Sequence, residues 1–179
     1  MAMRRREILK YAGLLAVGSQ FSRGVGAQST ESTWPMFQFD SANTGYNPDA
    51  SIATEQVGQR WRTSTLGEVV ASPVIANGMA FVGSRDGKVY AMDVEDGSKQ
   101  WEYNIGEPIE STPAVSNGSV FVGSTGGNVY SLSTDGDINW EFETNPDGAN
   151  QTILHPISVD SGLVFVISTT SYEEGYFMQ

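Results

Sequence analysis

Few residues in this sequence could perform acid–base or nucleophilic chemistry. His155 is the only histidine, and there is no cysteine, which excludes a thiolate nucleophile, a disulfide, and a cysteine-bound zinc or iron–sulfur centre. No second His or Cys can join His155 in a transition-metal site, so we expect it to be a packed or surface residue. A Ser–His–Asp triad is compatible with the composition, but no serine lies in the context of a nucleophile elbow.

An acidic cluster and a glycine-rich stretch are two further candidate sites. Asp93, Glu95 and Asp96 gather at one turn, where carboxylates could hold a weakly bound calcium ion, although solvated turn acids are the simpler interpretation. Residues 123–127 are glycine-rich, but they lack the Lys and the following helix of a phosphate-binding loop. The sequence therefore predicts no catalytic residue, no metal ligand and no cofactor-binding residue.

The elements that would position any site come from an internal repeat. Both copies contain a Ser/Thr-Pro dipeptide, the run Phe-Val-Gly-Ser, a Gly-x-Val-Tyr motif and a Trp-Glu pair. Pro73 and Pro113 are 40 positions apart, and so are Tyr90 and Tyr130. A period near 40 with short apolar runs and glycine-rich turns is typical of β-propeller blades.

Tight turns divide each copy into four short strands. Asn77-Gly78 and Asn117-Gly118 are strong hairpin signals, and Ser161-Gly162 takes their place in a third copy. We therefore expect an all-β fold, a partial β-propeller of four-stranded antiparallel blades. The blades are predicted at residues 69–104, 109–143 and 153–179, and the third is incomplete.

One copy resembles a known repeat family in detail. Ala91, Asp93, Gly97 and Trp101 match the tryptophan-docking motif of the pyrroloquinoline-quinone (PQQ)-type β-propeller repeat: Ala-x-Asp, Gly four residues on, and Trp four residues later. The second copy keeps Trp140 but departs from the motif before it, with serines in place of the Ala and the Asp. Trp61 precedes Trp101 by 40 positions and looks like an orphan outer strand. The resemblance implies that each Trp packs between adjacent blades, with its indole N–H held by a neighbour's backbone.

The resemblance allows two kinds of function. Quinoprotein dehydrogenases share this repeat and would imply PQQ, calcium and a catalytic Asp, but the alcohol-oxidising members carry an adjacent cysteine pair that is absent here. The other branch resembles the outer-membrane assembly lipoprotein, a non-enzymatic scaffold, although the lipid-bearing cysteine is also absent. We expect an exported, non-catalytic PQQ-like propeller protein that acts as a binding or scaffold module at the cell surface. A fragment of a quinoprotein dehydrogenase is the alternative.

The N-terminal part has the pattern of an export signal. Arg5-Arg6 begins a twin-arginine pattern, a short apolar run follows, and small residues end at Ala27. We expect residues 1–27 to be a twin-arginine signal peptide and residues 28–58 to be an irregular aromatic segment, followed by propeller repeats at 59–179. The aromatic segment could be a ligand platform, but packing against the domain is the favoured interpretation.

The charge excludes nucleic acid as a partner. The formal net charge is −11, and it becomes −15 without residues 1–27, which hold five of the ten basic residues and one of the 21 acidic ones. Such a surface repels polyanions. It fits either adaptation to high salt, which screens self-repulsion, or an ordinary acidic secreted protein.

The predicted blades are too few for a closed ring, since propellers usually have about four to eight. We expect the chain to be the N-terminal part of a longer propeller. The alternative is self-association of several chains through their open blade faces.

Overall fold

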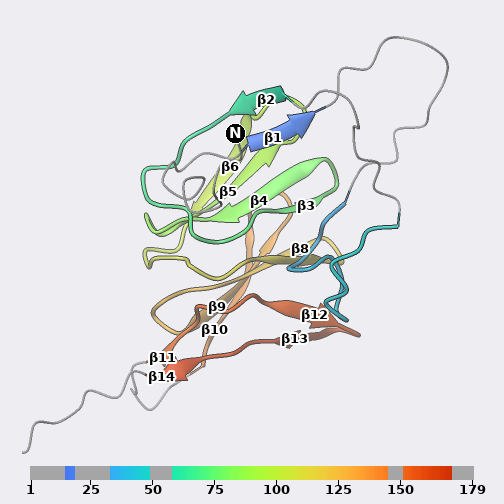
Figure 1. Ribbon diagram of the computed structural model, residues 1–179. Coiled ribbons are helices and arrows are strands. Elements are labelled where there is room, and N and C mark those ends of the chain that lie inside the picture. The colour runs from blue at the N-terminus through green and yellow to red at the C-terminus, as the bar shows by residue number, and fades with distance from the viewer. Residues whose placement is uncertain (1–14, 19–32, 49–57, 145–150, 171–179) are drawn as a thin grey trace, which may run out of the picture.

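The computed structural model describes residues 15–18, 33–48, 58–144 and 151–170. All regular elements in these ranges are strands, and none of the described residues belongs to a helix that could cross a membrane. The sheets follow one another through the molecule in chain order (Figure 1). The strands are β1 (Leu15–Gly18), β2 (Gly58–Arg62), β3 (Val74–Ala76), β4 (Met79–Gly83), β5 (Lys88–Asp93), β6 (Lys99–Asn104), β7 (Ala114–Ser116), β8 (Ser119–Gly123), β9 (Asn128–Ser133), β10 (Ile138–Glu143), β11 (Gln151–Thr152), β12 (Ser158–Asp160), β13 (Leu163–Phe165) and β14 (Thr169–Thr170).

Two four-stranded antiparallel sheets form the first two blades. Blade 1 has the order β3-β4-β5-β6, and blade 2 has the order β7-β8-β9-β10, so each strand pairs with its neighbour in sequence. The innermost hairpins turn at Asn77-Gly78 and Asn117-Gly118, where both residues of each pair have positive φ. This is the geometry of a type I′ turn, which matches the twist of the flanking strands. The predicted all-β partial β-propeller is confirmed.

The main core lies between the two blades. β5 and β9 are each buried over four consecutive residues, because both faces of a middle strand are covered. Side chains of blade 1 such as Phe81 and Val89 pack against Val120, Val122 and Leu132 of blade 2. The outer strands β6 and β10 are much more exposed. The apolar runs of the sequence therefore mark the inter-blade interface.

The third copy is only partly built within the described residues. Its inner hairpin, β12–β13, turns at Ser161-Gly162 with the same positive φ angles as in the other two copies. β11 and β14 form a separate two-stranded ladder. β12 lies beside β7, as β7 lies beside β3, so the innermost strands of the three copies are neighbours.

The orphan strand that carries Trp61 has a backbone partner. β2 pairs antiparallel with β1, which places Leu15 opposite Arg62 and Gly18 opposite Gly58. β1 lies inside the stretch predicted as an export signal. The strand before blade 1 is therefore paired on at least one edge.

A carboxylate joins each blade to the chain segment that enters it, but the two blades supply it from opposite sides. In blade 1, the Asp86 carboxylate accepts hydrogen bonds from the backbone N–H groups of Leu66 (3.0 Å) and Gly67 (3.2 Å) and from the Tyr90 hydroxyl (2.6 Å). In blade 2, the acid and the glycine swap places: Gly126 stands 40 residues after Asp86, and Glu107 stands 40 residues after Gly67.

The Glu107 carboxylate fills the space that the glycine leaves. It accepts hydrogen bonds from the Ser124 hydroxyl (2.5 Å) and the Asn128 amide (3.4 Å). A Cβ at Gly126 would overlap this carboxylate. One acid at each junction is thus kept, although the residue that provides it changes.

The Asp86 junction makes stability depend on pH. Burial opposes ionisation of Asp86, but hydrogen bonds from Tyr90, Ser84 and the Lys88 backbone outweigh it, so the pKa of Asp86 lies below its usual value. A lowered folded-state pKa contributes stability above the unfolded-state pKa of about 3.9, and this stability is lost as the pH falls through the folded-state value. We predict that Asp86→Asn lowers the free energy of unfolding by about 1–3 kcal/mol at pH 7. In urea titrations from pH 7 to pH 3 the gap to wild type should shrink below about pH 4; a gap that stays constant contradicts the prediction.

Candidate functional site

Two of the three repeat tryptophans bridge neighbouring blades in the same way. The Trp61 indole N–H donates a hydrogen bond to the Val94 carbonyl (2.8 Å), and the Trp101 indole N–H donates one to the Thr134 carbonyl (2.8 Å). Each tryptophan thus reaches the turn between the third and fourth strands of the next blade. Each acceptor lies 33 residues after its tryptophan. The contact therefore repeats with the sequence.

The other residues of the predicted docking motif lie on β5 and in the turn after it, which receives Trp61. Ala91 is fully buried and pairs with Trp101 across β5 and β6. The Asp93 carboxylate accepts a hydrogen bond from the Glu95 backbone N–H (2.7 Å), which shapes the turn. Gly97 lies directly under the Trp61 ring with a φ of +73°.

The third tryptophan has no equivalent turn above it in the described part of the chain. Trp140 packs against Phe121, with ring centroids 5.9 Å apart, and is 41% exposed. No described residue accepts a hydrogen bond from its indole N–H. The docking motif therefore brings Trp61 and Trp101 into inter-blade contacts and leaves Trp140 on an open face.

The acidic cluster of this turn does not converge on a common point. The Asp96 carboxylate accepts a hydrogen bond from the Ser98 backbone N–H (2.8 Å), and Glu95 forms an ion pair with Arg60. Within the described ranges, no three His, Cys, Asp or Glu side chains are placed to hold a metal ion. The carboxylates act on the turn and on the neighbouring strand.

Two glycines test how much the contact between Trp61 and its receiving turn contributes to the free energy of unfolding. Gly97 and Gly118 have nearly equal φ angles, +73° and +74°, so an alanine is strained to a similar extent at both. A Cβ at Gly97 would lie 2.5 Å from the Trp61 ring, whereas a Cβ at Gly118 would meet nothing within 4 Å. We predict that Gly97→Ala lowers the free energy of unfolding by about 1–3 kcal/mol more than Gly118→Ala does. Urea unfolding of both variants checks this, and equal losses would show that the indole does not restrain the turn.

The best candidate for a binding site lies on the inner strands, under residues 33–48, which we call the N-terminal strap. Trp34 and Ile75 of β3 exchange two backbone hydrogen bonds (2.6 and 2.8 Å), and the Pro35 carbonyl accepts one from Val115 of β7 (2.7 Å). Met36 is buried in a cluster with Phe121 and Ile157. The strap thus crosses blades 1 and 2 at their innermost strands.

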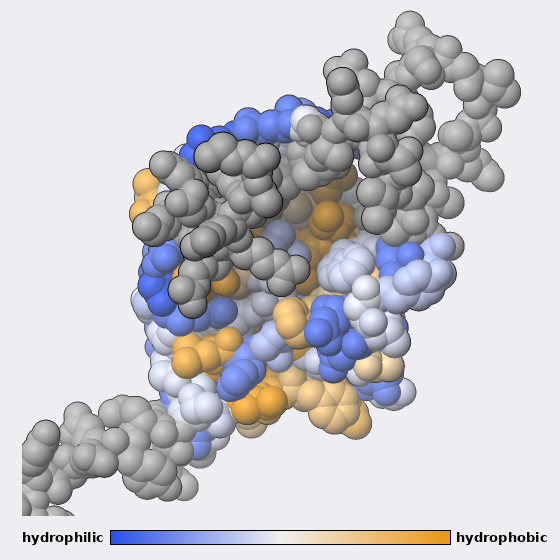
Figure 2. Space-filling model, viewed as in Figure 1, coloured by the Kyte–Doolittle hydropathy of each residue, from blue (hydrophilic) through white to orange (hydrophobic). Residues whose placement is uncertain are grey.

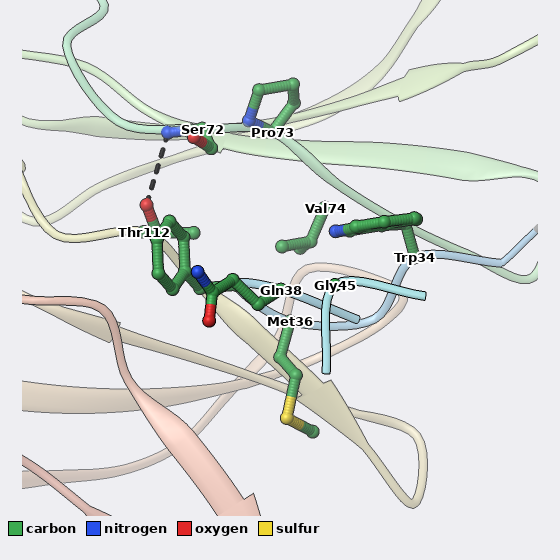
Figure 3. A pocket seen from close by; sticks show the side chains of 9 residues that line it. Trp34, Met36, Gln38, Gly45, Ser72, Pro73, Val74 and Thr112 are labelled. Carbon is green, nitrogen blue, oxygen red and sulfur yellow. Dashed lines mark hydrogen bonds between the residues drawn. The ribbon is translucent and has the colours of Figure 1, made fainter. Parts of the chain in front are cut away.

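A cavity of about 290 Å³ lies between the strap and the starts of the two blades. Figure 3 shows Gln38 and Trp34 of the strap facing the blade side of this cavity, where the Ser72 backbone N–H donates a hydrogen bond to the Thr112 hydroxyl (3.2 Å). The cavity is lined by Trp34, Met36, Phe37, Gln38, Gly45, Ser72, Pro73, Val74 and Thr112. Its polar groups are hydroxyls, an amide, an indole and backbone, so it offers hydrogen bonding and apolar contact.

The strap is strained next to this cavity. Gln38 and Phe39 have φ angles of +54° and +77°, a region that non-glycine residues rarely adopt. The Asp40 carboxylate supports this turn by accepting hydrogen bonds from the Thr44 hydroxyl (2.6 Å) and backbone N–H (2.9 Å), and these bonds lower the pKa of Asp40. Strain of this kind gathers at binding and active sites, where the surrounding structure holds it.

His155 lies apart from this cavity. It is exposed, in a bend before Pro156 rather than in a strand, and it does not line the cavity. The sequence indicates the aromatic segment as a possible ligand platform but does not indicate the cavity itself. One sequence feature points to it: Ser72 and Thr112 occupy the same repeat position, before a proline and just ahead of the first strand of each blade.

Comparison with known proteins places the fold in a family. Residues 49–171 match the family model described as outer membrane protein assembly factor BamB. The chain belongs to this family. Its repeats are therefore PQQ-like β-propeller repeats, as the docking motif predicted. No curated protein shows significant sequence similarity to the chain.

Solved structures share the fold at low sequence identity. BamB from Moraxella catarrhalis has a TM-score of 0.56 and 18% identity, covering 62% of this chain and 38% of that protein. The quinohemoprotein alcohol dehydrogenase ADHIIG from Pseudomonas putida HK5 has a TM-score of 0.68 and 22% identity, and that from Comamonas testosteroni has 0.64 and 21%; each match covers 77% of this chain and 23% of the enzyme. The chain thus spans well under half the length of these proteins, and the likeness concerns the fold.

Proposed function

We propose that the chain is an exported, non-catalytic β-propeller protein that binds a partner at the cell surface. The observation that carries this proposal is the chemistry of the strap cavity, where Gln38, Ser72 and Thr112 supply neutral polar groups among apolar side chains. Such a lining suits recognition by shape and hydrogen bonding. Acid–base catalysis needs an ionisable group within hydrogen-bond reach of the substrate, and the lining of this cavity contains none.

The proposed route to the surface rests on the N-terminal sequence. We assign residues 1–27 as a twin-arginine signal, because Arg5-Arg6 is followed by a short apolar run. The aromatic segment at 28–58 and the repeats at 59–179 follow this signal. The acidic surface supports a protein that works in a salty medium outside the cell. Membership of the BamB family supports a role in the cell envelope.

The alternative is that the chain is a piece of a quinoprotein dehydrogenase. The structural likeness to two such enzymes suggests this alternative. Such an enzyme would need PQQ and calcium. The described residues do not fit a calcium site, because no three carboxylates converge and the cavity lining has no carboxylate. We therefore derive no redox step for this chain.

Site-specific crosslinking tests the binding role. A photoreactive phenylalanine analogue at position 37, on the cavity, should crosslink to one discrete partner in the cell envelope when the full chain is expressed. The same analogue at position 66, where Leu66 is 87% exposed and is not among the residues that line the cavity, serves as the matched control. Adding Gln38→Trp, which fills the cavity, should abolish the adduct. Identical adducts from positions 37 and 66, or no adduct from either position, would contradict the proposed binding role.

A redox assay tests the alternative. The purified full chain, incubated with PQQ and Ca²⁺, is expected to reduce no artificial electron-acceptor dye with primary alcohols or aldoses as substrates. Quinone-dependent dye reduction above that of the heat-denatured chain would overturn the non-catalytic assignment.

A further inference from the structure

The turn between β7 and β8 carries a sequence that its equivalents lack. Asn117-Gly118-Ser119 is an Asn-x-Ser sequon, the acceptor sequence for N-linked glycans. The equivalent turn of blade 1 is Asn77-Gly78-Met79, and that of the third copy is Ser161-Gly162-Leu163, so neither of these is a sequon. A second sequon begins at Asn150, which lies outside the described residues.

The fold accounts for the first two residues of the sequon at Asn117. Asn77 and Asn117 have φ angles of +52° and +49°, and the glycines after them have +72° and +74°. In both turns the glycine carbonyl accepts a hydrogen bond of 3.0 Å from the turn between the third and fourth strands of the same blade. An Asn-Gly pair is what a type I′ turn favours. Asn117 and its glycine therefore indicate a turn, and by themselves they indicate no modification.

The fold does not account for the third residue of the sequon. At the equivalent positions Met79 packs against the main core, and Leu163 is also apolar. Ser119 brings a hydroxyl to this position, and within the described ranges its side chain takes part in one hydrogen bond, accepted from the Asn139 amide (3.3 Å). The turn thus forms with an apolar residue here, whereas a sequon requires the hydroxyl.

Asn117 lies where a modifying enzyme can reach it. The residue is exposed at the tip of the hairpin, and no described residue forms a hydrogen bond with its side chain. A glycan is bulky, so its acceptor must be at the surface. The side-chain amide of Asn117 meets this requirement without any rearrangement of blade 2.

We propose that Asn117 carries an N-linked glycan once the chain has been exported. The donor is an oligosaccharide joined to a lipid phosphate. The bond between its anomeric carbon and the phosphate oxygen breaks, and the phosphate leaves with the electron pair. The anomeric carbon bonds to Asn117 Nδ2, and one Nδ2 proton passes to a base of the transferase. This inference rests on the export that the proposed function includes, and it does not depend on the strap cavity.

The glycan and the strap cavity are compatible with each other. Thr112, which lines the cavity, comes before β7, whereas Asn117 comes directly after this strand. Five residues of extended chain between them span roughly 16 Å. Figure 2 shows hydrophilic and apolar residues side by side on the described surface. A glycan adds hydrophilic bulk to such a surface and leaves the cavity open to a partner.

Peptide mass analysis of the exported full chain tests the inference. Cleavage after Glu110 and Glu141 gives a peptide of residues 111–141, which contains Asn117 but not Asn150. We expect this peptide to exceed the mass of its sequence by that of an oligosaccharide. Asn117→Gln and Ser119→Ala should abolish the added mass, whereas Ser119→Thr, which preserves the sequon, should retain it.

The equivalent turn of blade 1 offers a matched gain of the site. Met79→Thr completes a sequon at Asn77, in a turn with nearly the same φ angles. We expect the peptide of residues 69–95 to acquire an oligosaccharide in this variant and to carry none in wild type. Circular dichroism checks that each variant is folded. An unmodified Asn77 in a folded Met79→Thr chain contradicts the view that exposure in this turn suffices.

Failure of the site can be told apart from failure of export. An exported chain whose peptide 111–141 has only the mass of its sequence overturns the inference, and so does an added mass that survives Ser119→Ala. A chain that stays inside the cells contradicts the proposed export instead. The full chain placed behind an established secretion signal then decides the site, and an unmodified Asn117 in that exported protein overturns the inference.

Discussion

The structure depends on the hydrogen bond between a tryptophan indole and a backbone carbonyl in the next blade. Trp61 and Trp101 each reach a turn 33 residues away, at 2.8 Å, and a glycine in that turn leaves room for the ring. The bond fixes where one blade lies on the next, since an indole that is largely removed from water must find an acceptor. Once the outer edges are fixed in this way, the innermost strands lie side by side. The strap cavity is built on that arrangement, because it needs Ser72 and Thr112 from different blades to meet.

The repeats conserve interactions more closely than they conserve residues. Blade 1 takes its junction carboxylate from the turn, at Asp86, and blade 2 takes it from the entering segment, at Glu107. Glycine stands at the vacated position each time, because a side chain would collide with its surroundings. Each junction therefore holds one acid to accept the local hydrogen bonds, and a second acid there would add like-charge repulsion. A comparison position by position would record two unrelated substitutions, whereas the geometry shows one exchange.

Much of the fold could be predicted because its causes are local. The period of 40, the Asn-Gly turns and the apolar middle strands are each written within a few neighbouring residues. The strap cavity was not predictable in the same way. Trp34 meets Ile75, and Pro35 meets Val115, but residues 33–48 do not themselves carry the repeat pattern, so their sequence does not indicate where they pack. The left-handed φ angles of Gln38 and Phe39 also leave no mark in residue type, since both residues normally avoid that region. The exchange of Asp86 and Glu107 is visible in the sequence only once the two junctions are superposed.

The two ends of the described blade array differ in how far they bury the repeat tryptophan. At the first end, Trp61 lies buried on the turn of blade 1; at the other end, Trp140 remains 41% exposed beside Phe142. Covering those rings removes apolar area from water, at roughly 25 cal/mol per Å². The exposure of the repeat tryptophans therefore rises along the described array, from buried Trp61 through half-buried Trp101 to exposed Trp140. The free energy that apolar burial contributes at each tryptophan falls in the same order within the described residues, because the hydrophobic contribution is roughly proportional to the apolar area removed from water.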